Sequence, residues 1–478
     1  MRFISIALLT FSAIASNAEP GSSTTPKEQN GWQQRRSEKS AAIKSHQYDL
    51  LMIGDSITHN FDKPKYQQVW KTFFEPRNAI SLGYSGGRTE NTLWNLTHGE
   101  LEGQSPKVVT LLIGTNNTDD ANYPIVHTAE EVAAGTEAII ALLREKLPET
   151  KILLLRIFPR TNEYRDNEGN ERGSAKKRFA ANHRAGELIA GLADNKQVFY
   201  LDVNHAFLRT DGSLDPELMP DLLHPSPKGA QAWAEAMEPT LAKLFGDEPR
   251  VSPPTNTALI PLPKIEEDFY DWWQRHEAIL KIKNEIDPEI VLIGDSITHL
   301  WGGKPEWKGR AAGGPESFAK TFAGKRVLNM GYGYDRIQNV LWRLDHGELR
   351  GLSPKHVILN IGTNKLWPSK KAKGNTAEEI AEGVEAVIRR IRAKVPHAEI
   401  TLMGIFPRGE KPTDRSREKI TRVNKLLKEI KGVKFLNLQD QFLQADGTIS
   451  RETMPDLLHP GEAGYEIWGK ALSPIIKR

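Results

Sequence analysis

The sequence contains no cysteine among its 478 residues. This absence excludes disulfide bonds, a cysteine nucleophile, a cysteine-ligated metal and a lipid-modified N-terminal cysteine. The sequence also has no run of lysine and arginine interleaved with aromatic residues, and its net charge is only +3. A nucleic acid is therefore a poor candidate for a partner. Beyond the N-terminus, no apolar stretch is long enough to cross a membrane.

The N-terminus has the pattern of a signal peptide. A positive start at Arg2 is followed by an apolar stretch over residues 3–15 and by the small-x-small run Ser16-Asn17-Ala18. This pattern predicts that residues 1–18 are removed and that the protein is exported, to the periplasm or outside the cell. Residues 19–30 are rich in Ser, Thr, Pro and Gly and predict a flexible spacer.

The chain repeats a set of motifs in the same order. The shared motifs are Gly-Asp-Ser-Ile-Thr-His (residues 54–59 and 294–299), Gly-Thr-Asn (114–116 and 362–364) and Met-Pro-Asp-Leu-Leu-His-Pro (219–225 and 454–460). Each copy exceeds 200 residues, so the repeat predicts duplicated domains, at 31–246 and 265–478. Five prolines between residues 247 and 264 predict a semi-extended linker.

Within each copy, short apolar runs alternate with amphipathic stretches. In the first copy the apolar runs cover residues 49–53, 108–113, 152–157 and 198–203. Thr128-Ala-Glu-Glu131 has the pattern of a capping box at the start of a helix. This alternation predicts an α/β fold, in which helices cover both faces of a parallel sheet.

Polar motifs follow the predicted strands. Ser56 directly follows the first strand, Gly86 lies in a glycine-rich loop after the second, and Asn116 follows the third. Asp221 and His224 lie in a proline-bounded loop before the last helix. Because ligands bind at the carboxyl ends of parallel strands, we expect these residues to meet at one sheet edge.

These residue types suit acyl transfer. A serine hydroxyl is a weak nucleophile that needs a base, here His224, and the base needs a third group, Asp221, to fix its tautomer. The oxyanion of the tetrahedral intermediate needs donors, which the N–H groups of Ser56 and Gly86 and the amide of Asn116 can supply.

Each motif alone has a simpler interpretation. Gly-Asp-Ser occurs in ordinary turns, and Asp-x-x-His occurs in helix caps and surface pairs. The alternative role of Asp221 and His224 is as metal ligands, but no further ligand stands at a suitable spacing, so we predict no metal and no cofactor. The Gly-x-Ser-x-Gly motif of α/β-hydrolases is absent at the serine. The conjunction of all motifs, in one order and twice, favours the catalytic interpretation.

The motifs resemble the SGNH, or GDSL-type, hydrolase superfamily, whose pattern is Gly-Asp-Ser, Asn-x-Gly-x-x-Gly, Gly-x-Asn and Asp-x-x-His. The Leu-Trp…Gly-Glu-Leu and Thr-Ala-Glu-Glu stretches of both copies are similar to the catalytic subunits of brain-type platelet-activating-factor acetylhydrolase. The resemblance covers both copies nearly end to end. It implies two tandem three-layer αβα (flavodoxin-like) domains, each with a five-stranded parallel sheet, and metal-free hydrolysis of short acyl esters.

By the same resemblance, the second copy carries a site of its own. Its counterparts are the nucleophile Ser296, the amide Asn364 and the pair Asp456 and His459. Tyr334 stands where the pattern has the oxyanion glycine. Its backbone N–H can still donate, but a side chain there strains a loop that needs positive φ, so the second site is either retuned or weakened.

The resemblance also predicts the walls of a small acyl pocket. These walls are Ile57 and Leu223 in the first copy, and Ile297 and Leu458 in the second. We expect an exported esterase that removes short acyl groups, chiefly acetyl, from small esters or from carbohydrate or envelope substrates. The alternatives are an O-acyltransferase with the same triad, a lipid esterase acting on platelet-activating-factor-like or lysophospholipid substrates, and a second copy that only binds. The sequence does not indicate an oligomeric state.

Overall fold

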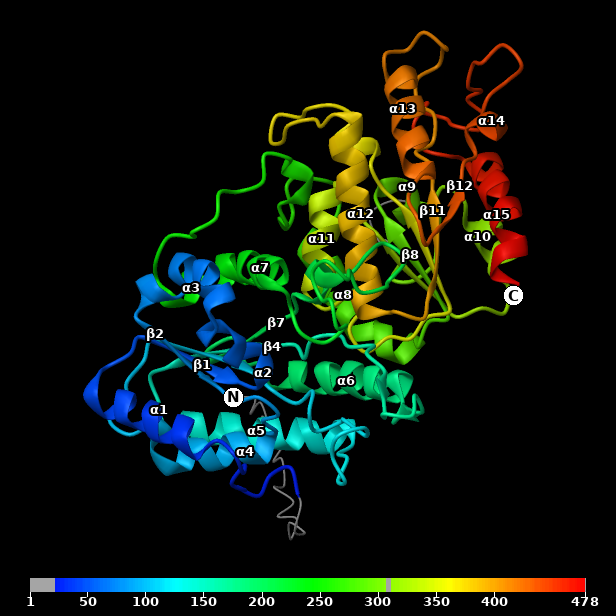
Figure 1. Ribbon diagram of the computed structural model, residues 1–478. Coiled ribbons are helices and arrows are strands. Elements are labelled where there is room, and N and C mark those ends of the chain that lie inside the picture. The colour runs from blue at the N-terminus through cyan, green and yellow to red at the C-terminus, as the bar shows by residue number, and fades with distance from the viewer. Residues whose placement is uncertain (1–21, 307–310, 478) are drawn as a thin grey trace, which may run out of the picture. The chain divides into compact units, whose positions relative to one another are not determined.

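The computed structural model describes residues 22–306 and 311–477 (Figure 1). The predicted signal peptide and residues 19–21 lie outside these ranges. The chain divides into two compact units, residues 1–200 and 201–478. This division falls within the first predicted domain, inside the last strand of its sheet (Val198–Leu201), so the domain boundaries at 31–246 and 265–478 stay a prediction.

The first sheet is built from five short strands. It has the order β2-β1-β3-β4-β7. Strands β1 and β2 are parallel, and so are β1 and β3, with Leu50 opposite both Ala79 and Val108. The strands are β1 (Leu50–Gly54), β2 (Ala79–Gly83), β3 (Val108–Leu112), β4 (Lys151–Leu155) and β7 (Val198–Leu201).

The second sheet repeats this topology. Read from β9, its order is β9-β8-β10-β11-β12, and its neighbouring strands are parallel. The strands are β8 (Ile290–Gly294), β9 (Val327–Gly331), β10 (His356–Asn360), β11 (Glu399–Met403) and β12 (Lys434–Leu436). The prediction of two tandem α/β domains with five-stranded parallel sheets is confirmed.

Helices flank the strands of each sheet. Those of the first copy are α1 (Gln33–Ser45), α2 (Ser56–His59), α3 (Gln67–Phe73), α4 (Thr89–Asn95), α5 (Ala129–Lys146), α6 (Ala175–Ile189) and α7 (Pro227–Phe245). Those of the second copy include α8 (Trp272–Ile286), α9 (Ser296–His299), α10 (Pro315–Thr321), α11 (Ile337–Asp345), α12 (Ala377–Lys394), α13 (Ser416–Lys428) and α15 (Glu462–Ile476). Thr128 and Thr376 form the predicted capping boxes at the start of α5 and α12.

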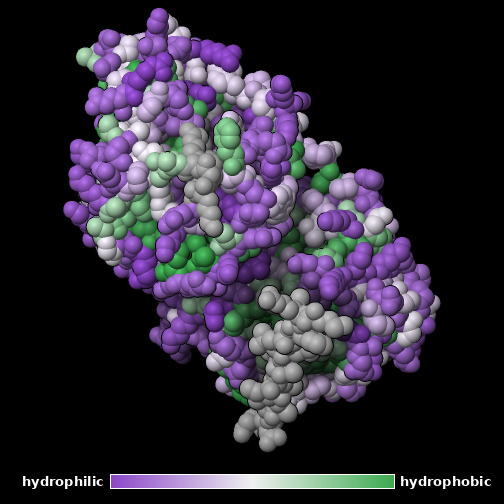
Figure 2. Space-filling view, turned by 180° about the vertical axis from the view of Figure 1, so that it is seen from behind, coloured by the Kyte–Doolittle hydropathy of each residue, from purple (hydrophilic) through white to green (hydrophobic). Residues whose placement is uncertain are grey.

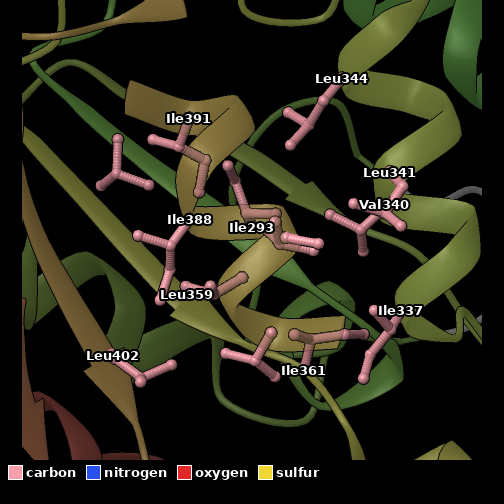
Figure 3. Packing of buried hydrophobic residues seen from close by; sticks show 14 of the residues in the cluster. Ile293, Ile337, Val340, Leu341, Leu344, Leu359, Ile361, Ile388, Ile391 and Leu402 are labelled. Atoms are coloured by element: carbon pink, nitrogen blue, oxygen red, sulfur yellow. The ribbon is translucent and has the colours of Figure 1, made fainter. Parts of the chain in front are cut away.

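The second sheet is buried on both faces. Successive residues of a strand point to opposite faces, so Ile293 packs against α11 and α12 while Leu292 packs with the cluster that contains Trp468 of α15. Figure 3 shows the first of these clusters, in which Ile293 and Leu359 lie among residues of α11 and α12. Such two-sided burial explains why the strands read as continuous apolar runs instead of alternating ones.

The predicted flexible spacer packs against the first unit over the residues that the structure describes. Ser23 is buried, its hydroxyl donates to the carbonyl of Glu131, and the N–H of Lys27 donates to the carbonyl of Glu90. Gly135 of α5 leaves the room for this segment, since a Cβ there would lie 2.8 Å from the carbonyl oxygen of Ser23. Residues 22–30 are therefore fixed by hydrogen bonds, which their Ser/Thr/Pro-rich composition did not reveal.

The predicted linker also packs in part. Ala258 is fully buried in the core beside α12, and Leu262 donates its N–H to the carbonyl of Gln338. A Cβ at Gly383 of α12 would lie 2.9 Å from the Cβ of Ala258, as at Gly135 in the first copy. The prediction that the linker lies outside any core is thus wrong for residues 256–263.

Among the described residues, no helix combines the length and the apolar character that crossing a membrane requires. Figure 2 shows one face of the molecule, on which hydrophilic side chains predominate and hydrophobic ones form separate patches.

We expect Gly135→Ala to destabilise the chain. A Cβ at this position would lie 2.5 Å from Oγ1 of Thr89 as well as against Ser23. Overpacking costs about 1–3 kcal/mol, against a gain of up to about 1 kcal/mol from helix propensity. Urea unfolding measures the difference, with Gly191→Ala as the control because a Cβ at Gly191 meets nothing within 4 Å. Equal stability of the two variants would mean that residues 22–24 do not dock on α5.

Candidate active site

The nucleophile candidates lie in a tight turn between a strand and a one-turn helix. Asp295 caps α9, since its Oδ1 accepts the N–H of Ile297 at 3.0 Å, and Ser296 is the first residue of this helix. Asp55 and Ser56 repeat the arrangement at the start of α2. Both serines are half-buried, at the carboxyl end of a central strand.

In the second copy, the three predicted triad residues are in contact. The Nε2 of His459 lies 2.9 Å from the Oγ of Ser296, and its Nδ1 lies 2.6 Å from Oδ2 of Asp456. The other carboxylate oxygen of Asp456 accepts the N–H groups of Leu458 at 3.0 Å and His459 at 2.7 Å. The residue between, Leu457, has φ +62°, a left-handed conformation that allows this close turn.

The hydrogen bonds of this loop set its protonation. Partial burial raises the pKa of Asp456, but hydrogen bonds from His459 outweigh it and lower the pKa below its usual value. The ionised carboxylate accepts a proton-bearing Nδ1, which leaves Nε2 as an acceptor for the serine hydroxyl. This arrangement suits proton removal from Ser296.

The first copy has the same aspartate–histidine geometry. Nδ1 of His224 lies 2.7 Å from Oδ2 of Asp221, whose Oδ1 accepts the N–H of His224 at 2.6 Å and of Leu223 at 3.0 Å. Burial raises the pKa of Asp221, but the hydrogen bonds from His224 bring it down to about 2. Leu222 is left-handed, at φ +57°, like Leu457. This pair belongs to the unit of residues 201–478, and Ser56 belongs to the unit of residues 1–200.

The predicted oxyanion loops have positive φ in both copies. Gly86 has φ +74° and Tyr334 has φ +59°. The amide of Asn116 donates to the carbonyl of Gly87 at 2.9 Å, and that of Asn364 donates to the carbonyl of Asp335 at 3.0 Å. One N–H of each amide thus holds the loop. The left-handed conformation costs a residue with a Cβ about 1–2 kcal/mol, so Tyr334 occupies a position at which glycine is favoured.

A buried ion pair, which the sequence analysis missed, fixes the predicted oxyanion loop of the second copy. Nε of Arg343 lies 2.9 Å from Oδ2 of Asp335, and the same guanidinium pairs with Glu348. Asp335 also accepts the indole N–H of Trp272 at 2.8 Å. A comparison of the two copies could have revealed this pair. Where the second copy has Asp335 and Arg343, the first has the uncharged residues Gly87 and Asn95.

The predicted acyl-pocket residues are mostly enclosed. Ile57, Leu223 and Ile297 are buried, and Leu458 is half-buried. Ile297 belongs to the apolar cluster on one face of the second sheet. Their place beside the serines and histidines in the chain is clear, and their role as acyl walls stays a prediction. Within the described ranges, no group of three or more His, Asp or Glu side chains is placed to hold a metal ion.

Comparison with known proteins identifies the class. Residues 52–232 and 292–467 each match the GDSL-like Lipase/Acylhydrolase family, and the chain belongs to this family. It is a carboxylic ester hydrolase of the SGNH type with two tandem domains.

Two relatives illustrate the similarity. The chain is 32% identical over 239 residues to platelet-activating factor acetylhydrolase IB subunit alpha1 of Bos taurus, across 49% of this chain and 92% of the relative. It is 33% identical over 222 residues to the alpha2 subunit of Homo sapiens, across 45% and 89%. Among solved structures, an acetylxylan esterase from Geobacillus stearothermophilus has a TM-score of 0.34 and 22% identity, over 39% of this chain and 93% of that one.

We expect Tyr334→Gly to leave the free energy of unfolding unchanged or to raise it by up to about 1 kcal/mol, because glycine relieves the left-handed strain. Tyr334 is 51% exposed, so removal of its side chain loses little packing. Urea denaturation measures this, with Phe269→Gly as the control, since Phe269 is 80% exposed and is not among the residues with positive φ. The control should lose about 0.5–1 kcal/mol. A larger loss for Tyr334→Gly than for the control would contradict the strain argument.

Proposed function

We propose that the chain hydrolyses short-chain esters, chiefly acetyl esters, at two Ser–Asp–His sites. The observation that carries this proposal is the contact of His459 with both Ser296 and Asp456, at 2.9 and 2.6 Å, in a chain of the acylhydrolase family. The names of the relatives, which are acetylhydrolases, support acetyl as the acyl group.

The proposed chemistry proceeds through an acyl-enzyme. His459 takes the proton of Ser296 as its oxygen attacks the ester carbonyl, and Asp456 stabilises the resulting imidazolium. The oxyanion is held by the backbone N–H groups of Ser296 and Tyr334 and by the second amide N–H of Asn364. The protonated histidine then gives its proton to the leaving alcohol, and a water molecule, activated by the same histidine, releases the acid and restores the serine.

For the first copy we assign the same roles to the corresponding residues. Ser56 is the nucleophile, His224 the base and Asp221 its orienting carboxylate, with Gly86 and Asn116 as oxyanion donors. The identical local geometry of the two Asp–His pairs supports this assignment. No step uses a metal, so we expect full activity in EDTA.

For the alcohol part of the ester, we favour carbohydrate or cell-envelope esters outside the cytoplasm. The predicted signal peptide supports export. Around the second site, the exposed side chain of Tyr334 provides an aromatic surface, and the hydroxyl of Tyr270 donates to the neighbouring Gly333 carbonyl at 3.3 Å. Aromatic rings of this kind suit sugar rings. Lipid esters and acyl transfer to a sugar hydroxyl are the rival activities, which an ester panel and a product analysis distinguish.

We expect acetyl esters to be cleaved much faster than octanoyl esters. We expect the walls proposed from Ile57 and Leu223, and from Ile297 and Leu458, to accept a short acyl group only. Rates on p-nitrophenyl esters of increasing chain length measure this. Each methylene that a complementary pocket accepts gains roughly 1 kcal/mol or more, so an equal or higher kcat/KM on the octanoyl ester would contradict the small pocket.

We expect the two sites to be unequal, with the first the faster. Ser56→Ala should remove most hydrolysis of p-nitrophenyl acetate and Ser296→Ala little, because Gly86 presents its N–H without the strain found at Tyr334. Losing an oxyanion donor costs about a hundred- to a thousandfold in kcat, and a displaced donor costs less. Both variants are compared on p-nitrophenyl acetate and on acetylated glycans. A greater loss from Ser296→Ala on every substrate would reverse the ranking.

A further inference from the structure

The oxyanion loop of the first copy is held by side chains at three consecutive carbonyl groups. The carbonyl of Ser85 accepts Nε2 of Gln29 at 2.9 Å and Nε1 of Trp32 at 3.0 Å. The carbonyl of Gly86 accepts the hydroxyl of Tyr123 at 2.8 Å. The carbonyl of Gly87 accepts the amide of Asn116 at 2.9 Å.

These hydrogen bonds fix the backbone N–H of Gly86, which is the proposed oxyanion donor. The N–H of Gly86 belongs to the same planar peptide group as the carbonyl of Ser85, so donors that hold this oxygen also fix the direction of the N–H. The bond from Tyr123 fixes the next peptide plane. Because glycine has little conformational preference of its own, the direction of its N–H depends on such external contacts.

We call these hydrogen bonds to the carbonyl groups of residues 85–87 the clamp. The clamp also explains why residue 86 is a glycine. A Cβ at Gly86 would lie 2.9 Å from the hydroxyl of Tyr123 and 3.2 Å from Nε2 of Gln29. In the second copy, Lys371 stands at the position of Tyr123, and Tyr334 replaces the glycine. There the carbonyl of Gly333 accepts the hydroxyl of Tyr270, over a longer distance of 3.3 Å. The second copy can therefore carry the side chain of Tyr334, because it has no tyrosine hydroxyl at the position of Tyr123 for that side chain to meet.

Tyr123 is itself held in place. The guanidinium of Arg88 lies 5.0 Å from the centre of its ring. The loop before it is fixed by Asp120, which pairs with Arg178 at 2.6 Å and accepts the N–H of Ser174 at 2.8 Å. Burial, with a smaller contribution from Asp119, raises the pKa of Tyr123 to about 12, so its hydroxyl stays a donor at all pH values at which the protein is assayed.

We propose that Tyr123, together with Gln29 and Trp32 of the N-terminal segment, positions the Gly86 N–H as the oxyanion donor of the first site. This inference rests on the proposed esterase function and assigns to these residues a positioning role, without contact to the reacting atoms. It gives residues 22–32 a function in catalysis, and it explains the expected superiority of the first site by the presence of the clamp as well as by the glycine.

The test uses the full chain with Ser296→Ala, so that only the first site reports. Tyr123→Phe removes one hydroxyl and should lower kcat on p-nitrophenyl acetate about tenfold with KM nearly unchanged, less than the hundred- to thousandfold cost of losing a donor. Gln29→Leu should act in the same direction, and the loss in the double variant should exceed either single loss. Tyr164→Phe is the matched control, because its hydroxyl accepts from Arg160 at 2.9 Å and is not bonded to the loop.

Three readouts separate positioning from other roles. The kcat loss of Tyr123→Phe should be the same factor from pH 6 to pH 9, because the hydroxyl does not titrate there; a change in the shape of the profile would indicate an acid–base role and overturn the proposal. Unchanged kcat in both Tyr123→Phe and Gln29→Leu would also overturn it, and so would an equal loss in Tyr164→Phe.

In a chain that carries Ser56→Ala, Lys371→Met should leave the activity of the second site unchanged. If the Ser296→Ala parent itself hydrolyses no ester while Ser56 is intact, the proposed function of the first site fails, which is a different result from a working parent with an insensitive clamp.

Discussion

Both sites depend on one steric constraint, at the turn that follows the first strand of each copy. A Cβ at Gly54 would lie 2.6 Å from the carbonyl of Leu112 on the neighbouring strand and closer still to Thr58, and Gly294 is enclosed in the same way. The chain can therefore leave the sheet only through a glycine, and the aspartate after it caps the short helix that follows. The serine thus stands at the sheet edge with its backbone N–H at a helix start, where donors without intrahelical partners are available to an oxyanion.

The rest of each site is assembled by separate loops, which explains how the copies diverge without losing the fold. The Asp–His loop is nearly identical in both, down to the left-handed leucine at 222 and 457. The oxyanion loops differ instead. The first copy holds a strain-free glycine through side chains on the carbonyl oxygens, whereas the second holds a left-handed tyrosine above a buried Asp335–Arg343 pair. A buried pair fixes geometry more than it adds stability, since desolvation offsets its attraction.

The sequence predicts most of the shared framework and little of what distinguishes the copies. Apolar runs, the capping boxes and the repeated motifs were sufficient for the sheets, the helices α5 and α12 and the positions of Ser296, Asp456 and His459. Composition misled for residues 22–30 and 256–263, because Ser, Thr and Pro in a short segment do not reveal which carbonyl groups lie nearby to bind. Tyr123 was missed for a related reason: its partner is a backbone oxygen, and a backbone contact leaves no pattern in the sequence. The Asp335–Arg343 pair did leave a pattern in the sequence, because both of its members are replaced together in the first copy.

Part of what the sequence analysis missed lies outside the family-matched ranges. The family match begins at residue 52 in the first copy and at 292 in the second, after the segments that carry Gln29, Trp32 and Tyr270. The acylhydrolase pattern contains the proposed nucleophile, base and amide of both copies, while the contacts to the carbonyl before the proposed oxyanion N–H come from residues outside it. Under the proposed function, two domains with corresponding catalytic residues can then differ in rate through segments that carry no catalytic motif. Changes in those segments need not alter the loop sequence, because their side chains donate to backbone oxygens, which accept from any suitably placed N–H or O–H donor.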